Sequence, residues 1–305
     1  MSGAQQVLAA GPSVSVKRRW QPPGHGRMHG PDVALAIAFV APYAALFFAF
    51  AVYPIGYALW MGSKPSLYAD LIADPLYLSS VLNTMLFVGV GVNVTMFLAL
   101  LLSGFFMRPR WWIKALLVVY VLPWMLPAVQ ACIAFRWMLA GEEALVDRAL
   151  AVLIGVDGPI WFNHWWLALG ANIVAYVWKW MPFWTVIFLA GRMAIPRDVS
   201  DAAAVDGAAG SRRFVHVTFP LLANLYLVCT LLSTVWTIGE FTTVYFVSGG
   251  APVWSTEVLA TLAFHYAFDA ANPALGVAAV MSVLPLLVPV VIVLMRALQT
   301  RAVQL

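Results

Sequence analysis

Residues 75–107 read PLYLSSVLNTMLFVGVGVNVTMFLALLLSGFFM and contain no charged side chain. A helix needs about 20 mostly apolar residues to cross a bilayer, so this stretch is long enough to span a membrane. It is too continuously apolar for a strand of a membrane barrel, in which apolar and polar residues alternate. The stretch therefore predicts a membrane-spanning helix.

The same character extends along the whole chain. Of its 305 residues, 63% are hydrophobic and 10% are charged, whereas a soluble domain carries about 25% charged residues. Five further stretches have at most one charge each and can each hold a helix: 33–63, 115–135, 158–191, 214–239 and 270–295. The expected fold class is all-α, a polytopic membrane protein with six transmembrane helices.

The lysines and arginines indicate the orientation of these helices. If the N-terminus is cytoplasmic, 13 of the 17 basic residues fall on the cytoplasmic side: Lys17, Arg18, Arg19, Arg27, Arg108, Arg110, Lys114, Arg192, Arg197, Arg212, Arg213, Arg296 and Arg301. Both termini are therefore expected to be cytoplasmic. The net charge of +4 is then a consequence of topology, and nucleic acid is not expected as a partner.

Several kinds of site are not expected on this chain. Residues 1–32 are rich in Gly, Pro and Ser and predict a flexible tail. The two cysteines, Cys132 and Cys229, have neither metal-type spacing nor an obvious disulfide role. No carboxylate pair, metal cluster or activated serine arrangement is apparent, and no Gly-x-x-x-x-Gly-Lys-Ser/Thr phosphate loop occurs. We therefore expect no catalytic residue, no metal site and no ATP hydrolysis.

Residues 195–220 read IPRDVSDAAAVDGAAGSRRFVHVTFP and are unusual for a connector. Pro196 suits the first turn of a helix, and Asp198 and Asp201 favour its positive N-terminal end. The alanines that follow have high helix propensity and little bulk, so a short helix could enter a groove on another protein. Gly207 permits close approach or ends the helix. An ordinary amphipathic surface helix is the alternative interpretation.

This stretch resembles the EAA loop of type I ABC importer permeases. The pattern is an acidic-Ala-Ala start, a glycine four residues after the second alanine, and a later proline. It is carried by Asp201, Ala202, Ala203, Asp206, Gly207, Ala208, Phe214 and Pro220. Asp201 stands where the family usually has glutamate. Further stretches similar to the sugar-type permeases are Asn83-Thr84, Pro182-Phe183 and Gly249-Gly250-Ala251-Pro252.

The resemblance implies a type I ABC importer permease (MetI-like) fold for residues 33–300, with a core of about 77–297 and a coupling loop at 195–220. It implies a permease subunit that forms half of the path for a sugar in a bacterial or archaeal cytoplasmic membrane. The substrate would be an oligosaccharide, a disaccharide or a related polyol or glycerol phosphate.

The resemblance also implies the partners of the chain. These are a second permease subunit in a heterodimer, two ATP-binding cassette ATPase subunits that receive the loop, and an extracytoplasmic sugar-binding protein. ATP and Mg would bind to the ATPase chains, with no cofactor on this one.

Sugar contacts are expected, from the same resemblance, on spans four and five. The candidates are Lys179, Trp180, Phe183, Ser233, Trp236, Thr237 and Glu240. Aromatic faces stack on sugar rings, and the spacing from Ser233 to Glu240 predicts one shared helix face. Packing of span five against span four is the alternative. Lys179 and Glu240 also raise the hypothesis of an ion pair between spans.

Two other classes of transporter provide rival hypotheses. A secondary ion-coupled transporter would usually contain internal repeats, and no convincing repeat relates the two halves of this chain. An ABC permease for a non-sugar solute is the second rival. The Gly249–Pro252 stretch and the spacing of Phe241, Val244 and Tyr245 favour sugars.

Overall fold

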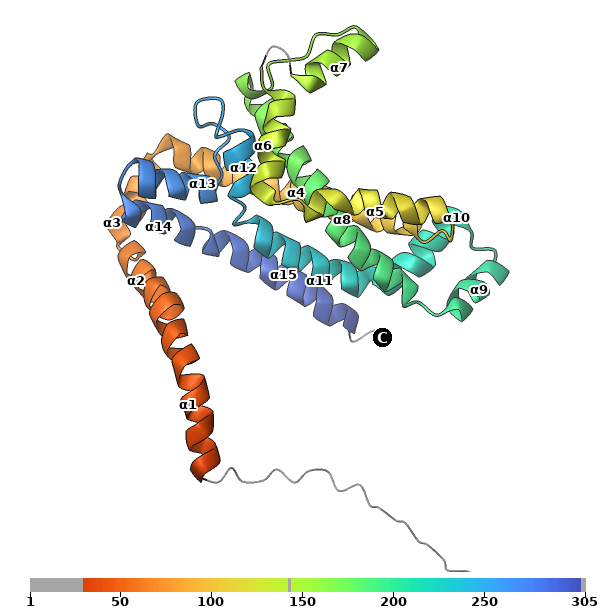
Figure 1. Ribbon diagram of the computed structural model, residues 1–305, viewed down its shortest axis with the longest axis horizontal. Helices are drawn as coiled ribbons and strands as arrows, with labels where there is room; N and C mark the ends of the chain where they lie inside the picture. The colour runs from red at the N-terminus through yellow and green to blue at the C-terminus, as the bar shows by residue number, and fades with distance from the viewer. Residues whose placement is uncertain (1–29, 142–143, 303–305) are drawn as a thin grey trace, which may run out of the picture. The chain divides into compact units, whose positions relative to one another are not determined.

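The computed structural model describes residues 30–141 and 144–302, and its elements there are helical throughout (Figure 1). The predicted all-α class is confirmed. The predicted tail lies outside the described residues except at 30–32, where the first helix already begins. In chain order the longer elements are α1 (Gly30–Phe47), α2 (Tyr53–Gly62), α3 (Pro65–Ala73), α4 (Pro75–Phe106), α5 (Trp111–Met125), α6 (Ala128–Leu139), α7 (Leu145–Ile154), α8 (Trp165–Met193), α9 (Arg197–Val205), α11 (Phe219–Thr237), α14 (Pro273–Met281) and α15 (Leu284–Ala302).

Shorter helical turns connect these elements. They are the π-helical turns η1 (Phe48–Val52), η3 (Phe214–Thr218) and η4 (His265–Asp269), the 3₁₀ turn η2 (Trp161–Asn163), and the short helices α10 (Gly210–Arg213), α12 (Thr242–Val247) and α13 (Leu259–Phe264). The chain forms two compact units, Met1–Ile55 and Gly56–Leu305. The described part of the first unit consists of α1, η1 and the start of α2.

Five helical stretches in the described part are long and apolar enough to cross a membrane. They are Val33–Gly62, Pro75–Phe106, Trp165–Met193, Gly210–Thr237 and Pro273–Thr300. These correspond to five of the six predicted spans, with ends that shift by several residues. The fourth span begins at Trp165 rather than at residue 158, because η2 and an irregular stretch precede it.

The third predicted span, 115–135, is not one straight helix. It consists of α5 and α6, which are bent by 98° relative to each other, so the count of six holds if this pair forms a single span. The break lies at Pro127, which has no amide hydrogen to donate. A proline also disfavours helical geometry in the residue before it, and Leu126 is extended, with φ −66° and ψ 142°.

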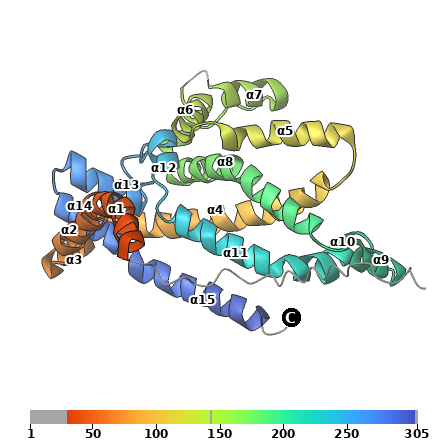
Figure 2. The same ribbon diagram turned by 60° about the horizontal axis from the view of Figure 1, so that its bottom comes forward.

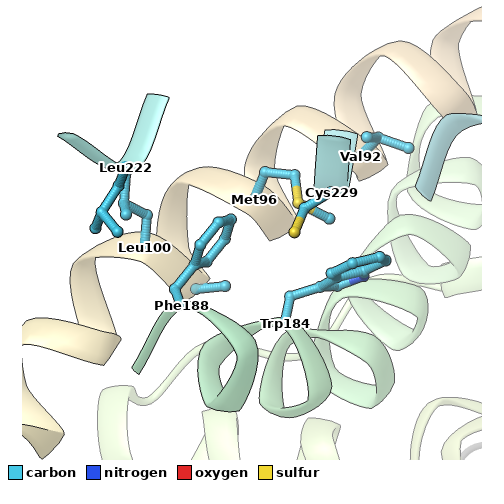
Figure 3. Packing of buried hydrophobic residues seen from close by; sticks show 8 residues of the cluster. Val92, Met96, Leu100, Trp184, Phe188, Leu222 and Cys229 are labelled. Carbon is cyan, nitrogen blue, oxygen red and sulfur yellow. The ribbon is translucent and has the colours of Figure 1, made fainter. Parts of the chain in front are cut away.

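The core of the larger unit lies where α4, α8 and α11 run beside one another (Figure 2). Its buried side chains come from all three helices, as Figure 3 shows for Val92, Met96, Leu100, Trp184, Phe188, Leu222 and Cys229. Phe188 and Met96 are completely inaccessible to solvent. This packing fixes α8 against α4 and α11, and the candidate sites below depend on it.

Candidate functional site

The loop after α8 contains the short helix α9, whose two ends are set by local sequence. Pro196 is the residue that precedes the helix rather than a member of its first turn. At the other end, the Gly207 amide donates to the Ala204 carbonyl (3.1 Å) and the Ala208 amide donates to the Ala203 carbonyl (2.9 Å). This pair of bonds is a Schellman motif.

Gly207 supplies the conformation that this motif needs. Its φ is 74°, in the left-handed region that costs other residues about 1–2 kcal/mol. A Cβ added at Gly207 would meet no atom within 4 Å. The glycine is therefore required by backbone geometry, and within this chain it ends the helix rather than allowing a close approach.

Most of the surface of α9 is uncovered in this chain. Asp201, Ala202 and Asp206 are exposed, whereas Ala203 is buried. Val205, at the C-terminal end of the helix, is 88% exposed. Val205 is apolar and exposed beside small residues, so its burial under another protein would remove apolar surface from water and favour binding.

The return from the loop into the membrane differs from the sequence prediction. α10, η3 and α11 follow one another without interruption, so the fifth span begins at Gly210 and Pro220 lies inside it. In η3 the Phe219 amide donates to the Phe214 carbonyl, five residues earlier. Such a π-turn widens the helix locally, next to a proline that cannot donate a backbone bond.

Four of the candidate sugar-contact residues, Trp180, Trp236, Thr237 and Glu240, line a small cavity of about 20 Å³ beside α8 and α11. It is lined by Tyr176, Trp180, Trp184, Trp236, Thr237 and Glu240. The rings of Trp180, Phe183, Trp184 and Trp236 pack together, with centroids 4.8–6.5 Å apart for the pairs in contact. A ligand pocket has about 300–1,000 Å³, so this cavity is closed to a sugar in the present conformation.

The hydroxyl groups beside the cavity join the two helices. The Tyr176 hydroxyl lies 2.5 Å from Thr237 Oγ1 and 3.3 Å from Ser233 Oγ. Ser233 is fully buried, whereas Trp236 is 53% exposed. α11 ends at Thr237, so Glu240 lies beyond the helix and the predicted shared face is wrong for it. Ser233 makes a packing contact, in line with the alternative interpretation.

Lys179 lies on α8 and is only 6% exposed. Its Nζ donates to the carbonyl oxygens of Leu126 (2.7 Å) and Pro123 (3.2 Å). In a continuous helix the Pro123 carbonyl would accept from residue 127, but a proline there has no amide hydrogen. The ammonium group therefore satisfies carbonyls that the break between α5 and α6 leaves without a helical partner, and its charge is favourable at the negative C-terminal end of α5.

Glu240 has a different local role. Its Oε1 accepts hydrogen bonds from the backbone amide of Thr243 (2.8 Å) and from Thr243 Oγ1 (2.9 Å), at the N-terminal end of α12. Among the described residues Lys179 and Glu240 make no ion pair with each other. The hypothesis of a direct pair is wrong for this conformation, because the Lys179 ammonium group donates to carbonyls at the end of α5 and the Glu240 carboxylate accepts from Thr243.

Sequence reasoning missed two residues that line the cavity, Tyr176 and Trp184. Both could have been found from their spacing, since they lie four residues before and after Trp180 and so share its face of α8. The described part of the chain contains no group of three or more His, Cys, Asp or Glu residues that could hold a metal ion.

Comparison with known proteins gives one matching family model, described as "Binding-protein-dependent transport system inner membrane component", over residues 91–304. The sulfoquinovosyl glycerol transport system permease protein SmoG of Agrobacterium fabrum is 31% identical over 246 residues, which cover 75% of this chain and 79% of that protein. The trehalose transport system permease protein SugA of Mycobacterium tuberculosis is 29% identical over 272 residues, which cover 79% of this chain and 81% of that protein.

A solved structure with a similar fold is a chain of a bacterial alginate ABC transporter in complex with an alginate pentasaccharide-bound periplasmic protein. It superimposes with a TM-score of 0.75 at 18% identity and covers 86% of this chain and 92% of that chain. This likeness confirms the predicted fold of an ABC importer permease.

Proposed function

The chain belongs to the family of binding-protein-dependent transport system inner membrane components, and we propose that it forms half of the path by which a neutral sugar crosses the membrane. It is a multi-pass inner membrane protein and the non-catalytic permease subunit of an ABC importer. Secondary ion coupling is thereby excluded, and the open questions are the substrate and the partners.

The observation that carries the substrate proposal is the aromatic cavity between α8 and α11. Three tryptophans and a tyrosine line it, and the faces of such rings are suited to stacking on sugar rings. Glu240 supplies the only charge among the lining residues. A carboxylate repels a phosphate or another anion, so a neutral disaccharide, oligosaccharide or polyol fits this lining better than glycerol phosphate. The trehalose system named for one relative is consistent with this class.

The cavity is only half of a binding site in this proposal. Its present volume is far too small for a sugar, and Trp236 is more than half exposed although it lies within a predicted span. A second permease subunit would cover Trp236 and supply the other wall, and rearrangement of the tryptophan rings would open the space. An extracytoplasmic binding protein would deliver the sugar to the pair.

The coupling loop would connect this path to ATP hydrolysis on two separate ATPase subunits. α9 is exposed and presents Val205 and small residues, as expected for a helix that docks in a groove. The proposed coupling residues are Asp201, Ala202, Ala203, Asp206, Gly207, Ala208, Phe214 and Pro220, of which Ala203 is buried within this chain. The turn between α4 and α5, which contains Arg108 and Arg110, lies at the same end of the bundle as α10, which contains Arg212 and Arg213 (Figure 1). This distribution of basic residues supports a cytoplasmic location for the loop, and we place both termini on the same side.

Transport in proteoliposomes tests the proposal. The chain would be reconstituted with its partner permease, ATPase subunits and binding protein, and uptake of neutral disaccharides would be compared with uptake of glycerol 3-phosphate. Trp236→Ala is expected to raise KM for the neutral sugar about two- to tenfold through loss of aromatic stacking. Trp166→Ala, at an exposed tryptophan of α8 outside the cavity, is the matched control. An unchanged KM in Trp236→Ala would remove the cavity from the path.

A second variant tests the charge argument. Glu240→Gln keeps an oxygen that can accept from the Thr243 amide but removes the negative charge. Uptake of the neutral sugar should persist, and an anionic sugar should compete more strongly in the variant than in the wild type. Preferential uptake of glycerol 3-phosphate by the wild type would contradict the neutral substrate class.

A further inference from the structure

Arg192, in the last turn of α8, joins three segments of the larger unit. Its Nε donates to Ser103 Oγ (2.7 Å) and its Nη2 donates to the Leu100 carbonyl (2.9 Å), both on α4. Its guanidinium carbon lies 5.4 Å from the centre of the Phe214 ring, in η3. One side chain thus holds together the end of α8, the last turns of α4 and the segment that leads into α11.

The contact with α4 is well defined in geometry. Ser103 is fully buried, and its own hydroxyl donates to the Leu100 carbonyl (2.6 Å), which leaves a lone pair to accept from Arg192. The guanidinium group is planar, with donors in fixed directions, so it resists reorientation better than a flexible ammonium group. Within the described residues no carboxylate is paired with Arg192, so neutral acceptors and an aromatic face hold the charge.

The position of Arg192 relates it to both ends of the coupling loop. α8 ends at Met193, directly before the loop, and Phe214 begins the π-turn directly after α9 and α10. On the other side, Leu100 belongs to the buried core that contains Trp184 and Phe188 (Figure 3). Trp184 in turn lines the aromatic cavity. A continuous set of contacts therefore runs from the two ends of the loop through Arg192 and α4 to the cavity.

We propose that Arg192 is a positioning residue that transmits displacement of the coupling loop to α4. The inference rests on the proposed function, since it requires that the loop be moved by an ATPase. Without the guanidinium group, Phe214 and the end of α8 could shift while α4 stays in place. ATP would then be hydrolysed with less sugar imported.

The test is the ratio of sugar imported to ATP hydrolysed by the full transporter in proteoliposomes, with the amount of assembled complex measured separately. Arg192→Leu should lower this ratio about two- to tenfold, the range expected when a coupling contact is lost. Arg108→Leu is the matched control. Like Arg192, Arg108 lies near an aromatic ring, with its guanidinium carbon 5.5 Å from the ring centre of Phe105, but it is exposed in the turn after α4. A purely structural role for Arg192 would reduce assembly and leave the ratio unchanged.

Two milder variants allow the ratio to be measured even if the complex with Arg192→Leu does not assemble. Arg192→Lys keeps the charge without the planar fork, and Ser103→Ala removes the acceptor while the arginine stays; both should lower the ratio less than Arg192→Leu does. If all assembled variants import as much sugar per ATP hydrolysed as the wild type does, the proposed role of Arg192 is overturned and the proposed function is not affected. Absence of sugar-dependent transport by the wild-type complex would instead overturn the proposed function, and this inference with it.

Discussion

The C-terminal ends of α9 and α5 are completed in different ways. At α9 the last carbonyls accept from amides within the same short stretch, because Gly207 turns the backbone back on itself. At α5 the carbonyls of Pro123 and Leu126 accept from Lys179, which lies 56 and 53 residues away along the chain. The first end is made by local conformation, and the second depends on how α8 packs against α5.

This difference suits the environment of each helix end. α9 lies in an exposed loop, where water can satisfy backbone groups and a local turn is sufficient. The break between α5 and α6 lies within an apolar stretch that is predicted to be in the membrane, where unsatisfied backbone groups cost several kcal/mol. Irregular backbone is tolerated there only when other parts of the protein satisfy it, and Lys179 does so.

Lys179→Met should have the largest effect on stability. Methionine fills similar space but cannot donate, so two carbonyls at the break lose their partner. We expect the free energy of unfolding in mixed micelles to fall by about 2 kcal/mol, since each unsatisfied buried group costs about 1–3 kcal/mol and burial of the ammonium group is relieved. Denaturation of the purified subunit by increasing fractions of an ionic detergent measures this.

Lys114→Met is the control for that experiment. Lys114 lies on α5 as well but is exposed, so its replacement should leave the unfolding midpoint close to that of the wild type. Equal effects of the two substitutions would show that Lys179 contributes only charge or length. The claim that Lys179 completes the C-terminal end of α5 would then be contradicted.

Gly207→Trp should affect coupling more than folding. A tryptophan at φ 74° adds strain of about 1–2 kcal/mol to the end of α9 and bulk to a surface proposed to enter the ATPase. Sugar uptake by the reconstituted transporter should be lost, or the ATPase should fail to co-purify. Gly207→Asn separates the causes, because asparagine tolerates this conformation, and it should retain most uptake. Normal uptake by Gly207→Trp would contradict docking at α9.

Pro127→Ala should have the smallest effect by itself. Alanine restores an amide at position 127, which could donate to the Pro123 carbonyl and so share the task of Lys179. The cost of Lys179→Met should therefore fall by about 1 kcal/mol in the Pro127→Ala background, a typical coupling between neighbouring sites. Strict additivity in the double-mutant cycle would mean that the proline does not create the need for Lys179.

Much of the architecture was predictable because the determining signals are local. Stretches with at most one charged residue identified five spans and the position of the sixth, and the alanines before Gly207 indicated a short helix in the loop. The start of the fifth span at Gly210 was missed, because the π-turn before Pro220 has no distinctive sequence pattern. The expected common face of Ser233 and Glu240 assumed a helix that in fact ends at Thr237.

The sequence by itself determined that this chain is a helical membrane protein and that a short helix lies in the loop between its fourth and fifth spans. Composition and local backbone preference act over one or two turns, so they can be recognised without the fold. Only the tertiary structure decided the partners of Lys179 and Arg192 and assembled the tryptophans into one closed cavity. Those outcomes depend on which helices pack together, and a polar group in a low-dielectric interior takes the nearest acceptor that this packing provides.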